Sequence, residues 1–161
     1  MSGYAAGTSV PVDRSKSEIE RVLAKYGADQ FVYAIGTPGA MVMFRAHGRC
    51  IRFIVPIPTR DDIQPPKKVR WGTTDDSVIQ KRLDQEGRRR WRALLLCIKA
   101  KLEAVASGIA TFENEFLPYT LISTPGGKRT VAEALGPTIE KALTADAIPN
   151  VAGLLSGPVP A

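Results

Sequence analysis

The stretch MVMFRAHGRCIRFIVPI (residues 41–57) decides the fold that this chain is expected to adopt. Apolar residues alternate with other residues on both sides of His47-Gly48, and a glycine at the second position suits a two-residue β-turn. This turn places four large apolar side chains on one sheet face, in the cross-strand pairs Phe44–Ile51 and Val42–Phe53. The opposite face is mixed, which is typical of a sheet that helices cover on one side only.

On the N-terminal side of this hairpin the sequence predicts another strand and a helix. Residues 31–35 form a short apolar strand that ends before the turn Thr37-Pro38-Gly39. Further upstream, Ser15 and Glu18 have the spacing of a helix capping box. The apolar residues that follow repeat with helical period; they are Ile19, Val22, Leu23 and Tyr26. A weak alternation at 7–12 predicts one more short strand.

On the C-terminal side the main prediction is a long helix that begins near Asp75 and Asp76 and can extend to Phe116. Its large apolar residues fall within a ~100° arc of a regular helix. They are Trp91, Leu94, Leu95, Ile98, Leu102, Val105, Ile109, Phe112 and Phe116. Gly87 and Gly108 are points at which this helix can bend or split.

The last part of the chain predicts a strand at 119–122 and a shorter helix opened by a second capping box, Thr130 and Glu133. That helix should face inward with its apolar residues Val131, Leu135, Ile139 and Leu143. The expected class is α+β, an antiparallel sheet of 4–5 strands with a long basic helix and shorter helices packed mainly on one face. Residues 1–146 should form one domain with a mobile loop at about 58–74, and 147–161 a flexible tail.

The positive charge of the chain is concentrated in one segment. Residues 67–101 contain eleven Lys and Arg but four Asp and Glu, whereas the rest of the chain is close to neutral and the whole carries a net charge of +6. Such an asymmetry indicates a polyanionic partner.

The basic segment predicts a nucleic-acid-binding site in two parts. A loop part combines cations with an aromatic ring that can stack on a base; it consists of Lys67, Lys68, Arg70 and Trp71. A helical part presents cations that can follow phosphates; it consists of Arg88, Arg89, Arg92 and Lys99. Single strands are slightly favoured over duplex, because no helix-turn-helix or other major-groove module is evident.

Two other interpretations of this segment stay open. The cations can form a solvated helix face whose charges are paired with neighbours such as Glu86. The segment can also bind a protein of the host or of a phage, for example a defence component. Because residues 94–98 are apolar nearly all round, self-association through the long helix is a further expectation.

Several classes of protein find no support in the sequence. No apolar run is long enough to span a membrane, and the N-terminus lacks the features of a secretion signal, so a cytoplasmic location is expected. With one histidine, His47, and no paired-cysteine motif, neither a metal site nor a cofactor is expected. Cys50 and Cys97 should be free and buried. The acidic pairs Asp61-Asp62 and Glu113/Glu115 favour solvated charge over catalysis, so no enzyme is predicted.

Four stretches of the sequence resemble small proteins encoded by bacteriophages and prophages. They are TSVPV (8–12), SKSEIERVLAKYGA (15–28), RFIVPIP (52–58) and the run RRRWRALLLCIKAKLEAVASGIATFENEFL that ends at Leu117. The likeness covers about residues 8–122. It implies that a phage encodes the protein and that the protein is located in the cytoplasm of the host cell. It implies no enzymatic activity. The expected order of three antiparallel strands and a long basic helix also looks like the core of Rad52-type single-strand annealing proteins, which is an analogy of architecture alone.

Overall fold

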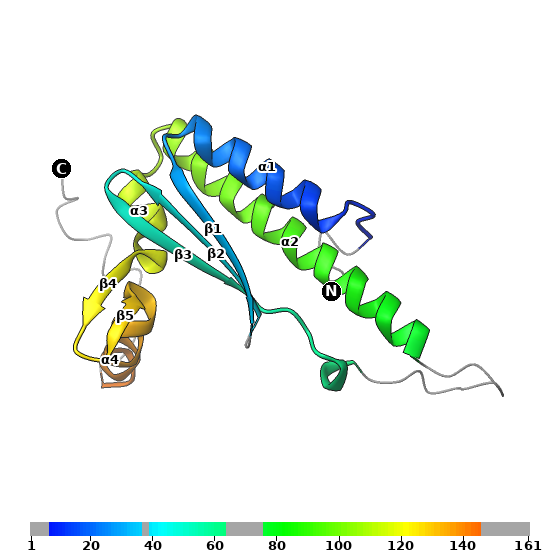
Figure 1. Cartoon of the computed structure of the whole chain (residues 1–161). Coiled ribbons are helices and arrows are strands. Elements are labelled where there is room, and N and C mark those ends of the chain that lie inside the picture. The colour runs from blue at the N-terminus through cyan, green and yellow to red at the C-terminus, as the bar shows by residue number, and fades with distance from the viewer. Residues whose placement is uncertain (1–6, 37–38, 64–75, 146–161) are drawn as a thin grey trace, which may run out of the picture.

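The computed structural model describes residues 7–36, 39–63 and 76–145. Its centre is an antiparallel sheet in the order β1-β2-β3, formed by Asp29–Gly36, Gly39–Ala46 and Arg49–Val55. A helix precedes this sheet, α1 at Val12–Lys25, and a long helix follows it, α2 at Asp76–Ala106 (Figure 1). A short 3₁₀ turn, η1 at Arg60–Asp62, lies in the connection between β3 and α2.

The β2–β3 hairpin has the predicted register. Phe44 pairs with Ile51 and Val42 with Phe53 across the two strands. His47 and Gly48 both adopt positive φ angles, 50° and 71°, as a two-residue turn that matches the twist of the strands requires. The hairpin prediction is therefore confirmed.

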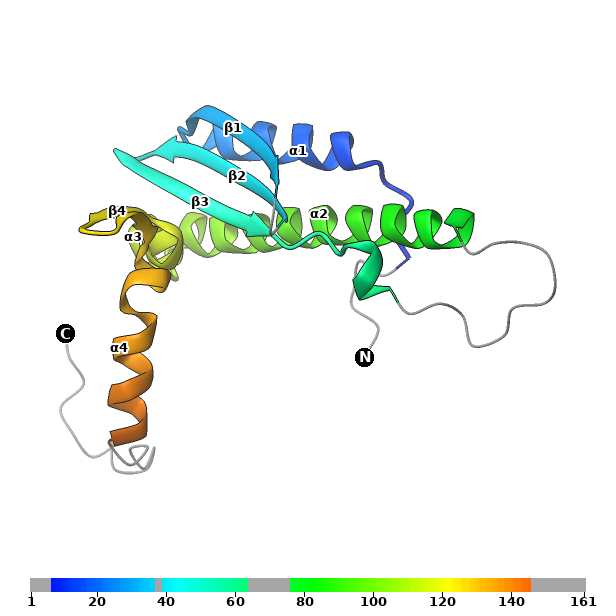
Figure 2. The ribbon, with the colours of Figure 1, turned by 60° about the horizontal axis from the view of Figure 1, so that its bottom comes forward.

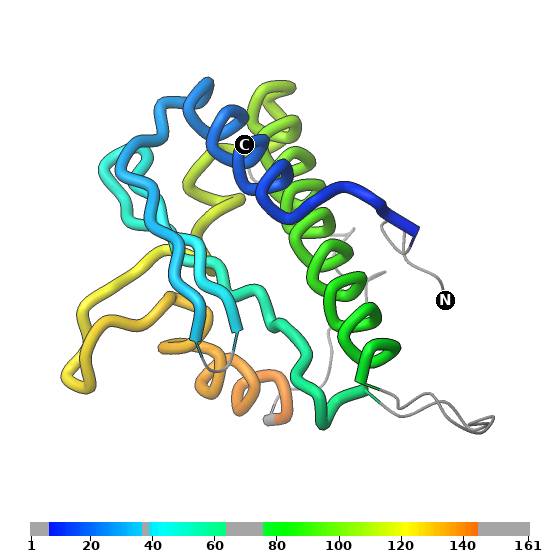
Figure 3. The backbone as a smooth tube through the Cα atoms, turned by 45° about the vertical axis from the view of Figure 1, so that its right-hand side comes forward, coloured from blue at the N-terminus to red at the C-terminus, as the bar shows by residue number. Residues whose placement is uncertain are grey.

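Helices α1 and α2 lie side by side and run in the same direction on one side of this sheet (Figures 1 and 3). The core between the helices and the sheet contains Ile19, Leu23, Val42, Phe44, Ile51, Phe53, Trp91, Leu95, Ile98 and Leu102, each less than 5% exposed. The side chains predicted to face the helices are thus the ones that are buried. Leu94 and Leu96, by contrast, are half-buried, and Leu94 packs against the edge of the core.

The long helix is shorter than the sequence predicted. It ends at Ala106, and Gly108 has a φ of 74°, a conformation that glycine adopts readily and that stops an α-helix. A separate helix, α3 at Phe112–Phe116, starts from Thr111, whose hydroxyl accepts a hydrogen bond from the Asn114 amide. Phe112 and Phe116 return to the core, but Ile109 in the connection is 82% exposed, so its predicted place in the buried arc is wrong.

The predicted single sheet of 4–5 strands is not found. After the 3₁₀ turn η2 (Leu117–Tyr119), strands β4 (Leu121–Thr124) and β5 (Gly127–Thr130) form a second sheet of their own. One isolated bridge, between Ile51 and Thr120, connects the two sheets. The strand expected at 7–12 is also wrong, because residues 8–11 are irregular and Val12 already belongs to α1.

The last helix, α4 at Val131–Ala145, does not face inward as predicted. The Thr130–Glu133 capping box is present, and the same Glu133 carboxylate also pairs with Arg52 of β3. Leu135, which lies ~160° from Glu133 around the helix, therefore points away from β3. Figure 2 shows α4 projecting from the rest of the domain. Leu135, Ile139 and Leu143 are 48%, 54% and 63% exposed.

Other expectations fall into three groups. Cys50 and Cys97 are free, as expected, but both are exposed, so their predicted burial is wrong. Within the described ranges, no helix has the combined length and apolar character that crossing a bilayer requires. The tail at 147–161 and most of the predicted loop, from residue 64 to residue 74, lie outside the described residues.

The unequal burial of two leucines gives a first prediction. We expect Leu95→Ala to lower the free energy of unfolding by about 2–5 kcal/mol, because Leu95 is 0% exposed and its removal leaves a cavity in the core. Leu135→Ala makes the same chemical change within α4, where the side chain is half exposed, and we expect a loss below about 1 kcal/mol. Urea unfolding of both variants measures the difference; equal losses would contradict the position of α4.

Candidate nucleic-acid interface

The eight predicted binding residues divide into two sets. Lys67, Lys68, Arg70 and Trp71 lie outside the described residues. The others, Arg88, Arg89, Arg92 and Lys99, all lie on α2. The structure therefore tests how the helical part is arranged.

Three of the four helical cations share one side of α2, and the fourth does not. Arg88, Arg92 and Lys99 lie within ~40° of each other around the helix axis. Arg89 is ~100° away from Arg88 and forms an i,i+3 ion pair with Glu86 at 2.7 Å. Arg90 approaches the same Glu86 carboxylate at 3.9 Å. Arg89 therefore belongs to a paired surface and not with the other three cations.

Glu18 of α1 organises the side of α2 that carries these cations. Arg92 Nη1 donates a hydrogen bond to one carboxylate oxygen at 3.1 Å, and Lys99 Nζ donates to the other. The hydrogen bond from Lys99, with further help from Arg92, lowers the pKa of Glu18. One carboxylate thus holds two cations at the line where α1 and α2 meet, and this group keeps an excess positive charge.

The role predicted for Glu18 in the sequence is therefore wrong. Helix α1 begins at Val12, after Pro11, so Ser15 and Glu18 lie inside the helix and form no capping box. Ser15 is fully buried and its hydroxyl has no hydrogen-bond partner among the described residues. Glu18 faces α2 instead, a relation between two helices that no local spacing reveals.

A second row of cations, which the sequence analysis missed, lies on α1. Arg14, Arg21 and Lys25 are exposed and lie within ~40° of each other around the helix. No ion pair involves them in the ranges that the structure describes. Arg14 and Arg21 line a shallow hollow together with Glu18, so this row borders the Glu18 group. The sequence contained a signal for this row, because Arg14, Arg21 and Lys25 are seven and four residues apart. The row lies outside the strongly basic segment.

We call this surface the basic seam: Arg14, Arg21 and Lys25 on α1, and Arg88, Arg92 and Lys99 on α2, with Glu18 between them. Arg88 contributes its full charge, because its guanidinium donates to the neutral side chain of Gln85 at 2.9 Å. Glu103, one helical turn beyond Lys99, lies at the end of the seam. Six cations and one central carboxylate give the seam a strongly positive potential.

Many other cations of the described residues are neutralised by carboxylates. These pairs are Lys16–Asp13, Arg45–Asp29, Arg49–Glu113, Arg52–Glu133, Arg60–Asp76 and Lys101–Glu115. The basic seam differs from these pairs because six cations gather there around one carboxylate.

Of the carboxylates considered for catalysis, Asp61 is exposed, and the other three have structural roles. Asp62 accepts hydrogen bonds from the amide and hydroxyl of Thr59, which lowers its pKa. Glu113 and Glu115 pair with Arg49 and Lys101. Among the residues in the described ranges, no group of three or more His, Cys, Asp or Glu side chains is arranged to hold a metal ion.

The shared carboxylate leads to a second prediction. We expect Glu18→Gln to lower the free energy of unfolding at pH 7 by roughly 1 kcal/mol, because Arg92 and Lys99 lose their anionic partner. A lowered carboxyl pKa stabilises the fold above the pKa of the unfolded chain, and this contribution disappears as the pH falls through the folded pKa. The variant and the wild type should therefore converge in acid, as denaturant unfolding at pH 7 and about pH 3 can measure. Glu140→Gln on the exposed face of α4 is the control, and equal stability of all three proteins at pH 7 would refute the role of Glu18.

Comparison with known proteins does not place the chain in a family: no family model matches it, and neither the curated proteins nor the solved structures contain a significant match. The resemblance to phage proteins stays a prediction. What the chain does must therefore be inferred from its own side chains and their geometry.

Proposed function

We propose that this protein binds nucleic acid by its phosphates along the basic seam. The observation that carries the proposal is that α1 and α2 each present a row of cations on adjoining surfaces, around one carboxylate that two of the cations share. Phosphates attract such a surface at long range and bind it mainly through release of counterions.

The spacing of the cations suits an extended polyanion. Neighbouring cations in each row are four or seven residues apart, which corresponds to about 6 or 10 Å along a helix. Glu18 holds Arg92 and Lys99 in place before any ligand arrives, so less side-chain entropy is lost on binding. The same carboxylate repels phosphates. It therefore orders the two cation side chains but weakens the attraction of the seam for a polyanion.

A single strand is the favoured form of nucleic acid. The parts of α1 and α2 that carry the seam lie side by side along one side of the sheet (Figure 3). They form a broad surface of two helices, whereas a major groove about 12 Å wide admits one protruding helix. An extended strand can follow a flat basic surface by its backbone. Lys67, Lys68, Arg70 and Trp71 remain part of the proposal as an additional contact region in the chain just before α2.

The row on α1 provides the third prediction. We expect the triple variant Arg14→Ala, Arg21→Ala and Lys25→Ala to bind single-stranded oligonucleotides at least tenfold more weakly at about 50 mM salt. The slope of log affinity against log salt should fall by about 2, since three phosphate contacts are removed from a single strand. Fluorescence polarisation titrations at several salt concentrations measure both quantities.

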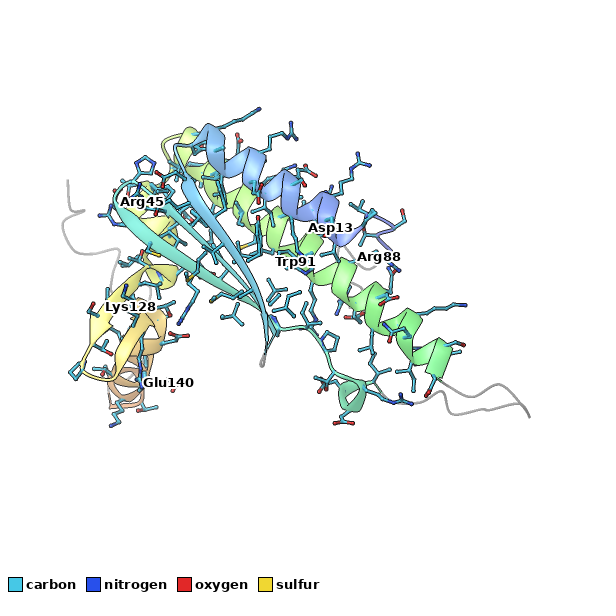
Figure 4. All side chains as sticks on the ribbon, in the orientation of Figure 1. Asp13, Arg45, Arg88, Trp91, Lys128 and Glu140 are labelled. Carbon is cyan, nitrogen blue, oxygen red and sulfur yellow. The ribbon has the colours of Figure 1, made fainter. Side chains whose placement is uncertain are left out.

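A matched control is available at the other end of the molecule. Lys128, Arg129 and Lys141 are exposed, and the described residues contain no ion pair for them. Figure 4 shows Lys128 far from Arg88. Replacing these three by Ala changes the net charge by the same amount, and we expect nearly unchanged binding. If both triple variants lose affinity equally, or if the wild type does not bind at low salt, the basic seam is not a nucleic-acid interface.

The exposed stripe of α4 supports a second candidate function, binding of a host or phage protein. Leu135, Ile139 and Leu143 lie at successive turns and are about half exposed or more, and such apolar surface commonly marks an interaction site. It replaces residues 94–98 as the surface for a protein partner or for a second copy, because Leu95 and Ile98 are fully buried in the core.

Sedimentation velocity provides the test of this second candidate. We expect the wild type to associate with itself or with a copurified protein, and the triple variant Leu135→Ser, Ile139→Ser and Leu143→Ser to remain a monomer with unchanged stability. A wild-type monomer without a bound protein at concentrations of about 100 μM would argue against this function, since specific interfaces commonly have dissociation constants far below that value.

A further inference from the structure

A groove lies at the end of the basic seam that is nearest to Arg88. It has a volume of about 520 Å³ and lies between the start of α1, the end of β1, the start of β2, the chain just after β3 and the N-terminal half of α2. This volume is within the range of ligand sites, which begins at about 300 Å³. Apolar side chains dominate its wall, among them Val12, Ile57, Leu83 and Trp91.

Gly87 leaves part of this groove unfilled. The residue is buried in the middle of α2, yet a Cβ atom placed on it would have no other heavy atom within 4 Å outside its own helix backbone and chain neighbours. A glycine inside a helix costs about 1 kcal/mol relative to alanine, and no packing contact of the described residues requires it here. The bare backbone of α2 at this point allows a flat ligand to approach closely.

Cations connect the groove to the basic seam. Arg88 lines the groove and also begins the α2 row of the seam, one helical turn before Arg92. Figure 4 shows Arg88 and Trp91 on the part of α2 that lies beside α1. Lys16 lines the groove too; its Nζ lies 5.0 Å from the centre of the Trp91 ring and 3.7 Å from the Asp13 carboxylate. A strand that follows the seam would therefore reach the mouth of the groove at Arg88.

Polar groups in the groove suit the edge of a base. Gln80 and Asp84 both line it, and the Gln80 amide donates a hydrogen bond to the Asp84 carboxylate at 2.9 Å. An amide can donate to and accept from a base edge, and a carboxylate accepts from an exocyclic amine such as that of cytosine. A carboxylate here repels phosphates, so the interior of the groove suits a base better than the backbone.

We propose that this groove binds one unpaired base of a single-stranded nucleic acid whose phosphates follow the basic seam. This inference rests on the proposed function. The base lies with one face against Leu83 and the bare backbone at Gly87, and its edge meets Gln80 and Asp84. A base within a duplex has its edge paired and its faces stacked, so the groove selects single strands.

The groove can be filled without removing a cation. We expect Gly87→Leu to weaken binding of a single-stranded oligonucleotide roughly tenfold, because the contacts of one base contribute about 1–3 kcal/mol. Binding of the polyanion heparin, which has no bases, should be unchanged. Gly136→Leu is the matched control, since Gly136 is a helix glycine with the same open surroundings on α4 and lies outside the groove. Gly87→Ala is a milder variant that should stabilise α2 and still reduce binding.

A second measurement uses the unaltered protein. A single strand with abasic sites should bind to the wild type more weakly than a normal strand does, with about the affinity of a normal strand for Gly87→Leu. The Gly87→Leu variant should bind the normal and the abasic strand equally. If the wild type binds normal and abasic strands equally, or if Gly87→Leu and Gly87→Ala leave affinity unchanged, the base site is refuted. If the α1 triple variant still loses affinity in that case, the proposal that the basic seam binds phosphates stands. If the α1 triple variant keeps full affinity, the proposed function itself is refuted.

Discussion

The burial of one face of the β1-β2-β3 sheet is the constraint on which the rest of the structure depends. Phe44 and Phe53 are removed from water and pack against each other and against Phe116 of α3. Helices α1 and α2 complete the same core with Ile19, Leu23, Leu95 and Ile98. Both helices therefore lie on the same side of the sheet, next to each other. As a result, Glu18 contacts Arg92 and Lys99, residues 74 and 81 positions later in the chain. The positions of these charges on the surface are therefore a consequence of how the two helices pack on the sheet.

The cations of the described residues differ in how they are paired. Those on the sheet and around α3 are neutralised by individual carboxylates, for example Arg52 by Glu133, and they connect elements of the fold. Those on the seam between α1 and α2 outnumber the carboxylate among them. A surface whose positive charge is not cancelled internally is suited to a partner that brings negative charge. The apolar groove adjoins this surface at Arg88, and the proposed binding of a base there would add to the proposed binding of phosphates.

Local rules and tertiary contacts disagree at α4. The Thr130–Glu133 capping box starts the helix as the sequence predicts, and the apolar residues repeat with helical period. However, the ion pair between Glu133 and Arg52 turns the polar side of the helix toward the sheet. The apolar side is consequently exposed. An amphipathic pattern shows that a face has to be covered, but it does not show whether the same chain covers it.

The sequence by itself determined the β2–β3 hairpin, its register and the buried faces of α1 and α2. These features depend on turn chemistry and on periodicity, which act between residues that are close along the chain. Tertiary structure alone decided that β4 and β5 form a separate sheet and that Glu18 joins two helices. It also brought Arg14, Arg21 and Lys25 beside the basic helix. The physical reason is that the period of a sequence pattern shows which residues share a face but not which distant residues this face contacts. Distant charges and apolar faces become neighbours only when the core forms.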